Sequence, residues 1–118
     1  PSVNALFQDD GALWVGTGFG RRGGILRIED GRETVLTKSD GLPGEMIRSI
    51  WRDSRGRMWI GSEYDGTVWQ GPGGWNLLTP EQGLAGWEVK TLAESGDGHL
   101  WLGTENGVTR MPLPGGSS

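Results

Sequence analysis

Short apolar runs alternate with polar, glycine-containing turns along the chain, and one pattern of this kind occurs three times. In residues 3–17, 47–62 and 89–104, an apolar-rich run of six residues precedes a polar turn and then the motif apolar-Trp-apolar-Gly-Ser/Thr. No segment places apolar residues at i, i+3, i+4 and i+7 over the length of a helix, so we expect no helix. The pattern predicts an all-β protein built from internal repeats.

Glycines divide each repeat into predicted strands. The expected strands are, in order within a repeat, residues 3–8, 47–52 and 89–94, then 13–17, 58–62 and 100–104, then 24–28, 66–70 and 107–111, then 33–36 and 75–78. The third repeat ends before it supplies a fourth strand. The motif tryptophans Trp14, Trp59 and Trp101 are 45 and 42 residues apart, a spacing that is typical of one four-stranded β-propeller blade.

The second strand of each repeat carries three consecutive apolar residues, whereas a half-exposed strand alternates apolar and polar positions. Both faces of this strand should therefore be covered, as they are when a blade is stacked between two others. The glycine two positions after each tryptophan points to the same face as that tryptophan and leaves room for a bulky group from the next blade. We expect a structural core that contains Trp14, Gly16, Trp59, Gly61, Trp101 and Gly103.

The fold class expected is therefore all-β, with propeller blades of four antiparallel strands and just under three blades in the chain. We expect blade 1 at residues 2–37, blade 2 at 46–79, blade 3 without its outer strand at 88–112, and a flexible tail at 113–118. Propellers have four to eight blades, so one chain forms an incomplete ring. Further blades of a larger parent protein, or a second copy in a six-bladed dimer, should cover the exposed blade faces.

Composition and charge argue against several classes of function. The chain has 118 residues, 23 glycines, seven tryptophans, no cysteine and a net charge of −4. The basic residues are scattered, which argues against nucleic-acid binding. No apolar run is long enough to span a membrane. With one histidine and no cysteine, a Ser-His catalytic pair or a Cys- or His-rich metal site is not expected, and the sequence suggests no cofactor and no metal.

The string Asp-x-x-Gly-x-Leu/Met-Trp-Ile-Gly-Thr/Ser, followed by a glycine and the third strand, resembles the two-component regulator propeller repeat. The linker 40–45, Asp-Gly-Leu-Pro-Gly-Glu, and its counterpart at 82–87 resemble the same family. The resemblance implies a propeller from the extracytoplasmic sensor region of a bacterial signalling protein, with a carbohydrate or small molecule as ligand. It implies a periplasmic or extracellular location for the parent protein.

In a four-stranded blade, the connections between the second and third strands and the linkers between blades emerge on one face of the disk. Binding residues concentrate on such loops. The connection of blade 1 is expected to be the longest of these turns, with arginines that could hold an anion. Trp87 is either a rim platform for a sugar ring or, as we expect, a buried plug. The candidate ligand-binding residues are Phe19, Arg21, Arg22, Tyr64, Asp65, Trp87, Glu105 and Asn106.

Three functions remain open from the sequence. The first is a non-catalytic module that binds a ligand or partner on this loop face. The second is an excised or engineered fragment whose main property is assembly into a ring. The third is an enzyme similar to the streptogramin lyases, whose repeats also contain Asp-Gly-x-Leu-Trp. We expect no catalytic residue here, because His99 falls in an exposed turn on the opposite face.

Overall fold

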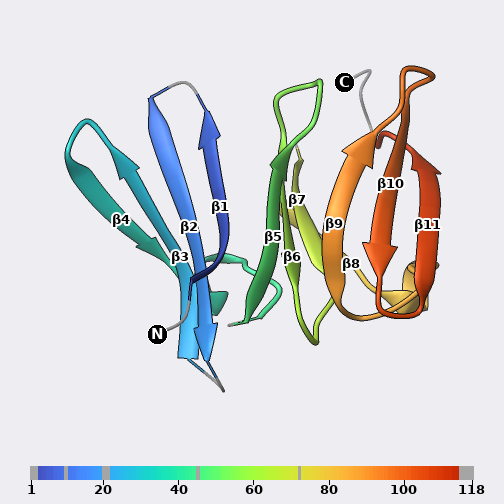
Figure 1. Cartoon of the computed structure of the whole chain (residues 1–118), viewed down its shortest axis with the longest axis horizontal. Coiled ribbons are helices and arrows are strands. Elements are labelled where there is room, and N and C mark those ends of the chain that lie inside the picture. Colours follow the sequence, from blue (N-terminus) through green and yellow to red (C-terminus); the bar gives the residue numbers. More distant parts are fainter. Residues whose placement is uncertain (1–2, 10, 20–21, 45, 72, 115–118) are drawn as a thin grey trace.

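Three antiparallel sheets follow one another along the chain in the computed structural model, which describes residues 3–9, 11–19, 22–44, 46–71 and 73–114. They are ordered side by side like consecutive blades (Figure 1). Blade 1 contains β1 (Val3–Asp9), β2 (Ala12–Phe19), β3 (Arg22–Glu29) and β4 (Arg32–Leu36); blade 2 contains β5 (Ile47–Arg52), β6 (Met58–Ser62), β7 (Thr67–Gly71) and β8 (Gly74–Leu78); blade 3 contains β9 (Val89–Glu94), β10 (His99–Thr104) and β11 (Gly107–Pro112). Every described strand pairs with its sequence neighbour in the same sheet.

The expected all-β blade architecture is confirmed, and the strands begin and end within two residues of their predicted bounds. One connection differs from the prediction. Residues 18–23 were expected to form a long turn, but Gly18 pairs with Gly23 and Phe19 with Arg22, so that β2 and β3 extend the ladder. The backbone at these four paired positions is extended, so the antiparallel pairing of β2 with β3 continues beyond the predicted strand ends.

The chain after blade 3 also differs from the prediction. Leu113 was placed in a flexible tail, but its side chain is 8% exposed and its N–H donates to the Gly98 carbonyl at 3.1 Å. The carbonyl of Pro114 accepts hydrogen bonds from Arg55 and Arg57 of blade 2. Residues 113 and 114 therefore fasten the last strand to the body of the protein.

Each linker between blades contains a single turn of 3-10 helix, which the sequence analysis did not expect. These turns are η1 (Lys38–Asp40) and η2 (Pro80–Gln82). In the second linker, the Thr79 N–H donates to Gln82 Oε1 at 2.8 Å, and Leu84 then enters the core with 3% exposure. Three residues are too few to produce a helical apolar period, so the pattern could not reveal them.

The hydrophobic core lies between the blades. One buried cluster joins blades 1 and 2 through Trp14, Ile25, Ile47, Ile50, Met58, Ile60 and others, and a second joins blades 2 and 3 through Trp59, Val89, Leu92, Leu100 and Leu102. Blade 2 contributes to both clusters, and all five residues of β6 are buried. The three consecutive apolar residues of this strand are therefore covered on both faces, as the pattern predicts.

Two glycines allow the blades to approach closely. A Cβ on Gly16 would lie 2.6 Å from Ile47 Cγ2 of blade 2, and a Cβ on Gly61 would lie 2.8 Å from Val89 Cβ of blade 3. Contacts this short are not tolerated in folded proteins. Each glycine therefore receives a branched side chain from the following blade, as expected from its position two residues after a motif tryptophan.

A buried carboxylate fixes the turn between β5 and β6. Asp53 is 4% exposed and accepts hydrogen bonds from the Arg57 guanidinium at 3.1 Å and from the Trp59 indole at 2.9 Å. Burial alone would raise the pKa of Asp53, but the hydrogen bonds from the Trp59 indole and the Arg57 backbone amide, together with the Arg57 charge, lower that pKa below its usual 3.8. The turn is thus tied to the core by an ionised group.

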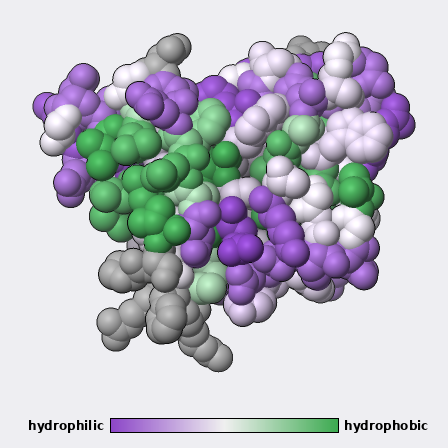
Figure 2. Space-filling model, in the orientation of Figure 1, coloured by the Kyte–Doolittle hydropathy of each residue, from purple (hydrophilic) through white to green (hydrophobic). Residues whose placement is uncertain are grey.

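The outer faces of blades 1 and 3 are open. Trp101 was expected in the core, but it is 39% exposed, whereas Trp14 is 5% and Trp59 is 0% exposed. The physical reason is that its indole faces away from blade 2, toward the side where the described chain has no further blade. Apolar residues also gather over blade 1 at the left of Figure 2, where Leu6 and Val35 are each 65% exposed.

Candidate functional site

Backbone hydrogen bonds bring the connections and linkers together at one end of the blades, at the lower edge of Figure 1. The N–H of Glu63, after β6, donates to the carbonyl of Met46 in the first linker at 2.9 Å. The N–H of Gly66 donates to the carbonyl of Trp87 in the second linker at 2.8 Å. The β6–β7 connection is therefore held between the two linkers, which is the loop face that the topology predicts.

A shallow pocket of about 510 Å³ opens on this face between blades 2 and 3. Its lining consists of Glu63, Tyr64, Asp65, Trp87, Glu88 and Glu105. The two aromatic side chains are well exposed, Tyr64 at 62% and Trp87 at 44%. Exposed aromatic rings beside a hollow provide flat apolar surfaces for a ligand.

Four carboxylates surround these rings, and one arginine partly compensates their charge. Arg48 Nε on β5 lies 3.0 Å from Glu88 Oε2 and 3.4 Å from Glu63 Oε1. Asp65 and Glu105 add two more carboxylates. The pocket therefore remains acidic, and its side chains mainly offer hydrogen-bond acceptors.

Glu105 also holds the linker in place. Its carboxylate accepts the backbone N–H of Glu88 at 3.0 Å and that of Trp87 at 3.3 Å. The bond from the Glu88 amide lowers the pKa of Glu105, so this group stays ionised near neutral pH. Trp87 is thus fixed through its amide and its carbonyl, and its ring lies beside the pocket.

The carboxylate of a neighbouring residue affects the pKa of the Tyr64 phenol. Hydrogen bonding to Glu63 and the charge of that group raise the pKa of the Tyr64 phenol. The phenol is therefore neutral at physiological pH and can donate or accept a hydrogen bond.

Among the residues that the structure describes, no group of three or more His, Cys, Asp or Glu side chains is arranged to hold a metal ion.

The structure brings four of the predicted site residues together, namely Tyr64, Asp65, Trp87 and Glu105. Asn106 does not line the pocket, because its Nδ2 donates to the Ala85 carbonyl at 3.1 Å and braces the linker. Arg21 and the side chains of Phe19 and Arg22 lie outside the described residues.

The expectation that Trp87 is a buried plug is wrong. The core position in this linker is taken by Leu84, which is 3% exposed, three residues earlier. The Trp87 backbone is fixed by the hydrogen bonds to Gly66 and Glu105. Its indole is consequently left at the surface.

The sequence analysis did not select Arg48, Glu63 and Glu88 as site residues. The repeat contained a signal for Glu63, because it occupies the position of Glu105, directly after the motif Gly-Ser/Thr. The ion pairs of Arg48 join groups from a strand, a connection and a linker. No spacing in the sequence predicts that combination.

His99 lies at the opposite end of blade 3, in the turn region between β9 and β10. It was expected to be an exposed turn residue, but it begins β10 and its side chain is 26% exposed. Its Nδ1 is 3.3 Å from Asp97 Oδ1. The Ser95 hydroxyl is the main cause that lowers the pKa of Asp97 to about 2, with a smaller contribution from His99.

The chain is similar in fold to extracellular domains of bacterial signalling proteins. It aligns with BT3049 from B. thetaiotaomicron, named as a hybrid two component system, at 24% identity and a TM-score of 0.78, over 95% of this chain and 16% of that one. It also aligns with two structures of BT4673 from the same organism, at 21% and 20% identity, TM-scores of 0.74 and 0.75, over 93% and 98% of this chain and 15% and 16% of those. The chain thus spans about one sixth of these domains.

No curated protein sequence matches the chain. Among the described residues, no helix is long and apolar enough to cross a membrane.

The family model of the two component regulator propeller matches residues 41–64 and 85–106. These segments contain a linker, the first two strands and the start of the next connection in blades 2 and 3. In these two blades the chain is therefore similar to the repeat of the two component regulator propeller family.

Proposed function

We propose that this chain is a non-catalytic part of an extracytoplasmic sensory propeller and that it binds a small hydroxylated ligand in the pocket between blades 2 and 3. The observation that carries the proposal is the exposure of Tyr64 and Trp87, which both line a hollow rich in carboxylates. The likeness to extracellular domains of signalling proteins supports the setting. The ligand class follows from the chemistry of the pocket.

The charge of the pocket selects among ligands. Carboxylates accept hydrogen bonds from hydroxyl groups, whereas a ligand carboxylate or phosphate would be repelled by them. Arg48 is already paired with Glu63 and Glu88, so it offers little to an anion. Neutral sugars meet these conditions, because their apolar ring faces stack on aromatic side chains while their hydroxyls donate to the carboxylates.

The placement of His99 supports a non-catalytic role for the pocket. This residue is the one histidine of the sequence, and it lies at the other end of its blade, on β10. The acidic groups of the pocket are exposed or already hydrogen-bonded, and the one lowered pKa there, that of Glu105, keeps the group ionised. A general acid would need a raised pKa near the working pH.

Isothermal titration calorimetry with a panel of neutral oligosaccharides and matched uronic-acid oligosaccharides tests the proposal. We expect at least one neutral member to bind and its uronic-acid counterpart to bind more weakly. Trp87→Ala and Tyr64→Ala should each reduce affinity about tenfold, which corresponds to about 1.4 kcal/mol. Trp101→Ala removes an exposed tryptophan from outside the pocket and should leave affinity unchanged.

Three results would count against the proposal. They are the absence of binding by any neutral sugar in the panel, equal binding of the uronic acids, and an equal loss of affinity in Trp87→Ala and Trp101→Ala. The circular dichroism spectrum of each variant checks that the fold is retained.

A further inference from the structure

We propose that the ligand of the pocket between blades 2 and 3 carries a protonated primary amine beside its hydroxyl groups, as an amino sugar does. This inference rests on the proposed function and names the ligand class of the same pocket. The features that carry it are the aromatic rings of the pocket, its excess of carboxylates and the pairing of Arg48. All of them lie at a junction between two blades that the structure describes.

The two aromatic rings of the pocket have no cation of the chain over their faces. Among the described residues, neither Tyr64 nor Trp87 forms a cation–π pair, although both rings are well exposed. A cation is attracted to the negative face of such a ring. The chain uses this attraction elsewhere, with a guanidinium 5.2–5.6 Å from a ring centre in the pairs Arg27 with Trp14, Arg57 with Trp69 and Arg110 with Trp101.

The arginine beside the pocket is held by carboxylates instead of lying over a ring. The register of β5 shifts between Ile47 and Ser49, so Arg48 is the extra residue of a β-bulge, a feature that re-aims a side chain. Its Nε lies 3.0 Å from Glu88 Oε2 and 3.4 Å from Glu63 Oε1. The chain thus directs this cation to two half-buried glutamates, and the ring faces stay open to a cation from a ligand.

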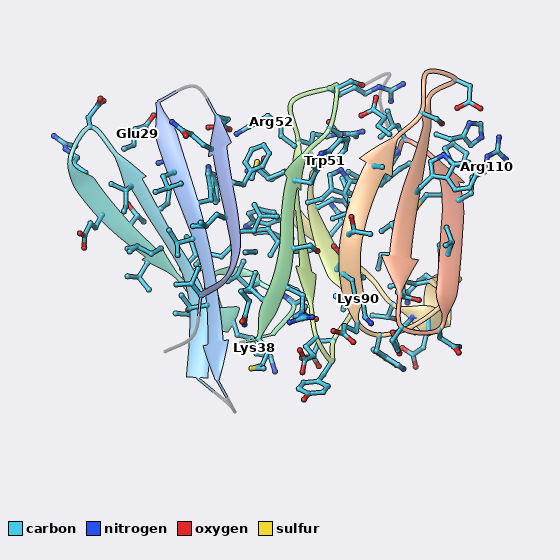
Figure 3. The ribbon with its side chains drawn as sticks, in the orientation of Figure 1. Glu29, Lys38, Trp51, Arg52, Lys90 and Arg110 are labelled. Atoms are coloured by element: carbon cyan, nitrogen blue, oxygen red, sulfur yellow. The ribbon has the colours of Figure 1, made fainter. Side chains whose placement is uncertain are left out.

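Negative charge exceeds positive charge around the pocket. Four carboxylates line it, and Asp and Glu side chains are ionised at neutral pH. Arg48 compensates one of these charges. The Lys90 ammonium acts on Glu105 from the second position of β9, at the lower end of that strand in Figure 3. Four negative and two positive side chains leave an excess of two negative charges, which a ligand ammonium reduces and a ligand anion increases.

An ammonium group also matches the hydrogen-bonding capacity of the carboxylates. It has three N–H donors and no acceptor, whereas a hydroxyl group has one donor. Each oxygen of Glu105 accepts one backbone N–H, from Glu88 at 3.0 Å or from Trp87 at 3.3 Å, and retains a second lone pair. Asp65 is exposed and follows Tyr64 in the same connection. Hydrogen bonds between an ammonium and these carboxylates are charge-assisted and therefore stronger than those of a hydroxyl.

The ring of an amino sugar uses the rest of the pocket. A metal ion would engage the carboxylates alone, and a neutral sugar would leave their excess charge in place. An amino sugar stacks its apolar ring face on an aromatic side chain while its ammonium lies among the carboxylates. The pocket volume of about 510 Å³ lies within the range of about 300–1,000 Å³ that is usual for small-molecule sites.

Isothermal titration calorimetry with three β-1,4-linked disaccharides tests the inference. They differ only in the group on C2 of each ring, which is hydroxyl in cellobiose, acetamido in di-N-acetylchitobiose and a primary amine in the glucosamine disaccharide. At about pH 6, below the pKa of an amine, and at low salt, we expect the amine to bind about tenfold more tightly than the two neutral sugars. At about 1 M salt, where charges are screened beyond about 3 Å, this difference should largely disappear.

Two charge-removing variants locate the effect. Asp65→Asn removes one exposed carboxylate of the pocket at nearly constant shape, and it should lower the affinity for the amine about threefold and leave that for cellobiose unchanged. Glu81→Gln is the matched control, because Glu81 is an exposed carboxylate of η2 in the same linker as Trp87 and does not line the pocket. It should leave all three affinities unchanged. Circular dichroism spectra of both variants check that the fold is retained.

The outcomes separate this inference from the proposed function. Equal affinity for the three disaccharides, or a preference for the amine that salt does not reduce, would overturn the inference and leave the proposed function standing. An equal effect of Asp65→Asn and Glu81→Gln would also overturn it. So would competition by methylamine at the same concentration as the amino sugar, because the pocket would then bind any cation without a sugar ring. Binding of none of the three disaccharides would refute the proposed function itself and this inference with it.

Discussion

Replacement of the buried motif tryptophan of blade 2 measures how much the blade stacking contributes to stability. Trp59 is 0% exposed, its indole N–H donates to Asp53 Oδ2 at 2.9 Å, and its ring stacks on Trp69 with 5.6 Å between ring centres. Removal of such a side chain leaves a cavity and costs 3–5 kcal/mol in measured cases. The lost bond leaves the buried Asp53 carboxylate one donor short, which adds to the cost. We expect Trp59→Ala to lower the free energy of unfolding by about 4 kcal/mol.

The third repeat supplies the matched comparison. Trp101 occupies the same motif position but is 39% exposed, and its indole N–H donates to the Ser95 hydroxyl at 3.1 Å at the surface. Its replacement removes less buried area and opens no enclosed cavity. We expect Trp101→Ala to cost about 1 kcal/mol, within the range of partly exposed positions.

Urea unfolding followed by far-ultraviolet circular dichroism gives both values, since tryptophan fluorescence changes with the substitution itself. If Trp59→Ala leaves too little folded protein, Trp59→Phe should still cost more than Trp101→Phe. A loss below about 1.5 kcal/mol for Trp59→Ala, or equal losses at the two positions, would refute the assignment of the core to the junctions between blades.

Two further predictions concern the turn of blade 2 and the first junction. Asp53→Asn should lower the free energy of unfolding by about 1–3 kcal/mol, because the donors around this carboxylate lose a charged acceptor. The pKa of Asp53 is lower in the folded chain than its usual 3.8, so its stabilisation is present above pH 4 and is lost as the pH falls through 3.8 toward the folded value. Thermal unfolding between pH 2 and 7 should therefore show a smaller loss of stability at acidic pH in Asp53→Asn than in the parent chain. The same pH dependence of stability in both proteins would contradict this. Gly16→Ala should cost about 1–3 kcal/mol, since the new methyl group would overlap Ile47. Gly96→Ala is the control, because nothing lies within 4 Å of an added Cβ there, and equal melting temperatures for the two variants would disprove the close approach.

The repeat explains why the fold could be predicted from the sequence. Three copies of the motif around Trp14, Trp59 and Trp101 fix the strand positions, and three consecutive apolar residues in β6 require covered faces on both sides. The same reasoning predicted the wrong burial for Trp101. The repeat motif shows which side chains can be buried, but a side chain is buried only where an adjacent blade covers it. The exposure of this residue is a property of the assembled blades.

The candidate site could be predicted only in part. Topology placed Tyr64 and Trp87 on one face, since connections and linkers alternate between the ends of the strands. The orientation of the Trp87 ring depends on hydrogen bonds to Gly66 and Glu105, and the charge of the pocket depends on the ion pairs of Arg48. Such contacts join residues whose spacing follows no period.

The position of blade 2 between two core clusters also affects how the chain opens. A protein in which each blade contacts mainly its neighbours loses structure from its ends, because an end blade breaks one junction and the middle blade must break two. Backbone amides of β6 should therefore exchange with deuterium more slowly than those of β2 and β10, although the three strands share one motif.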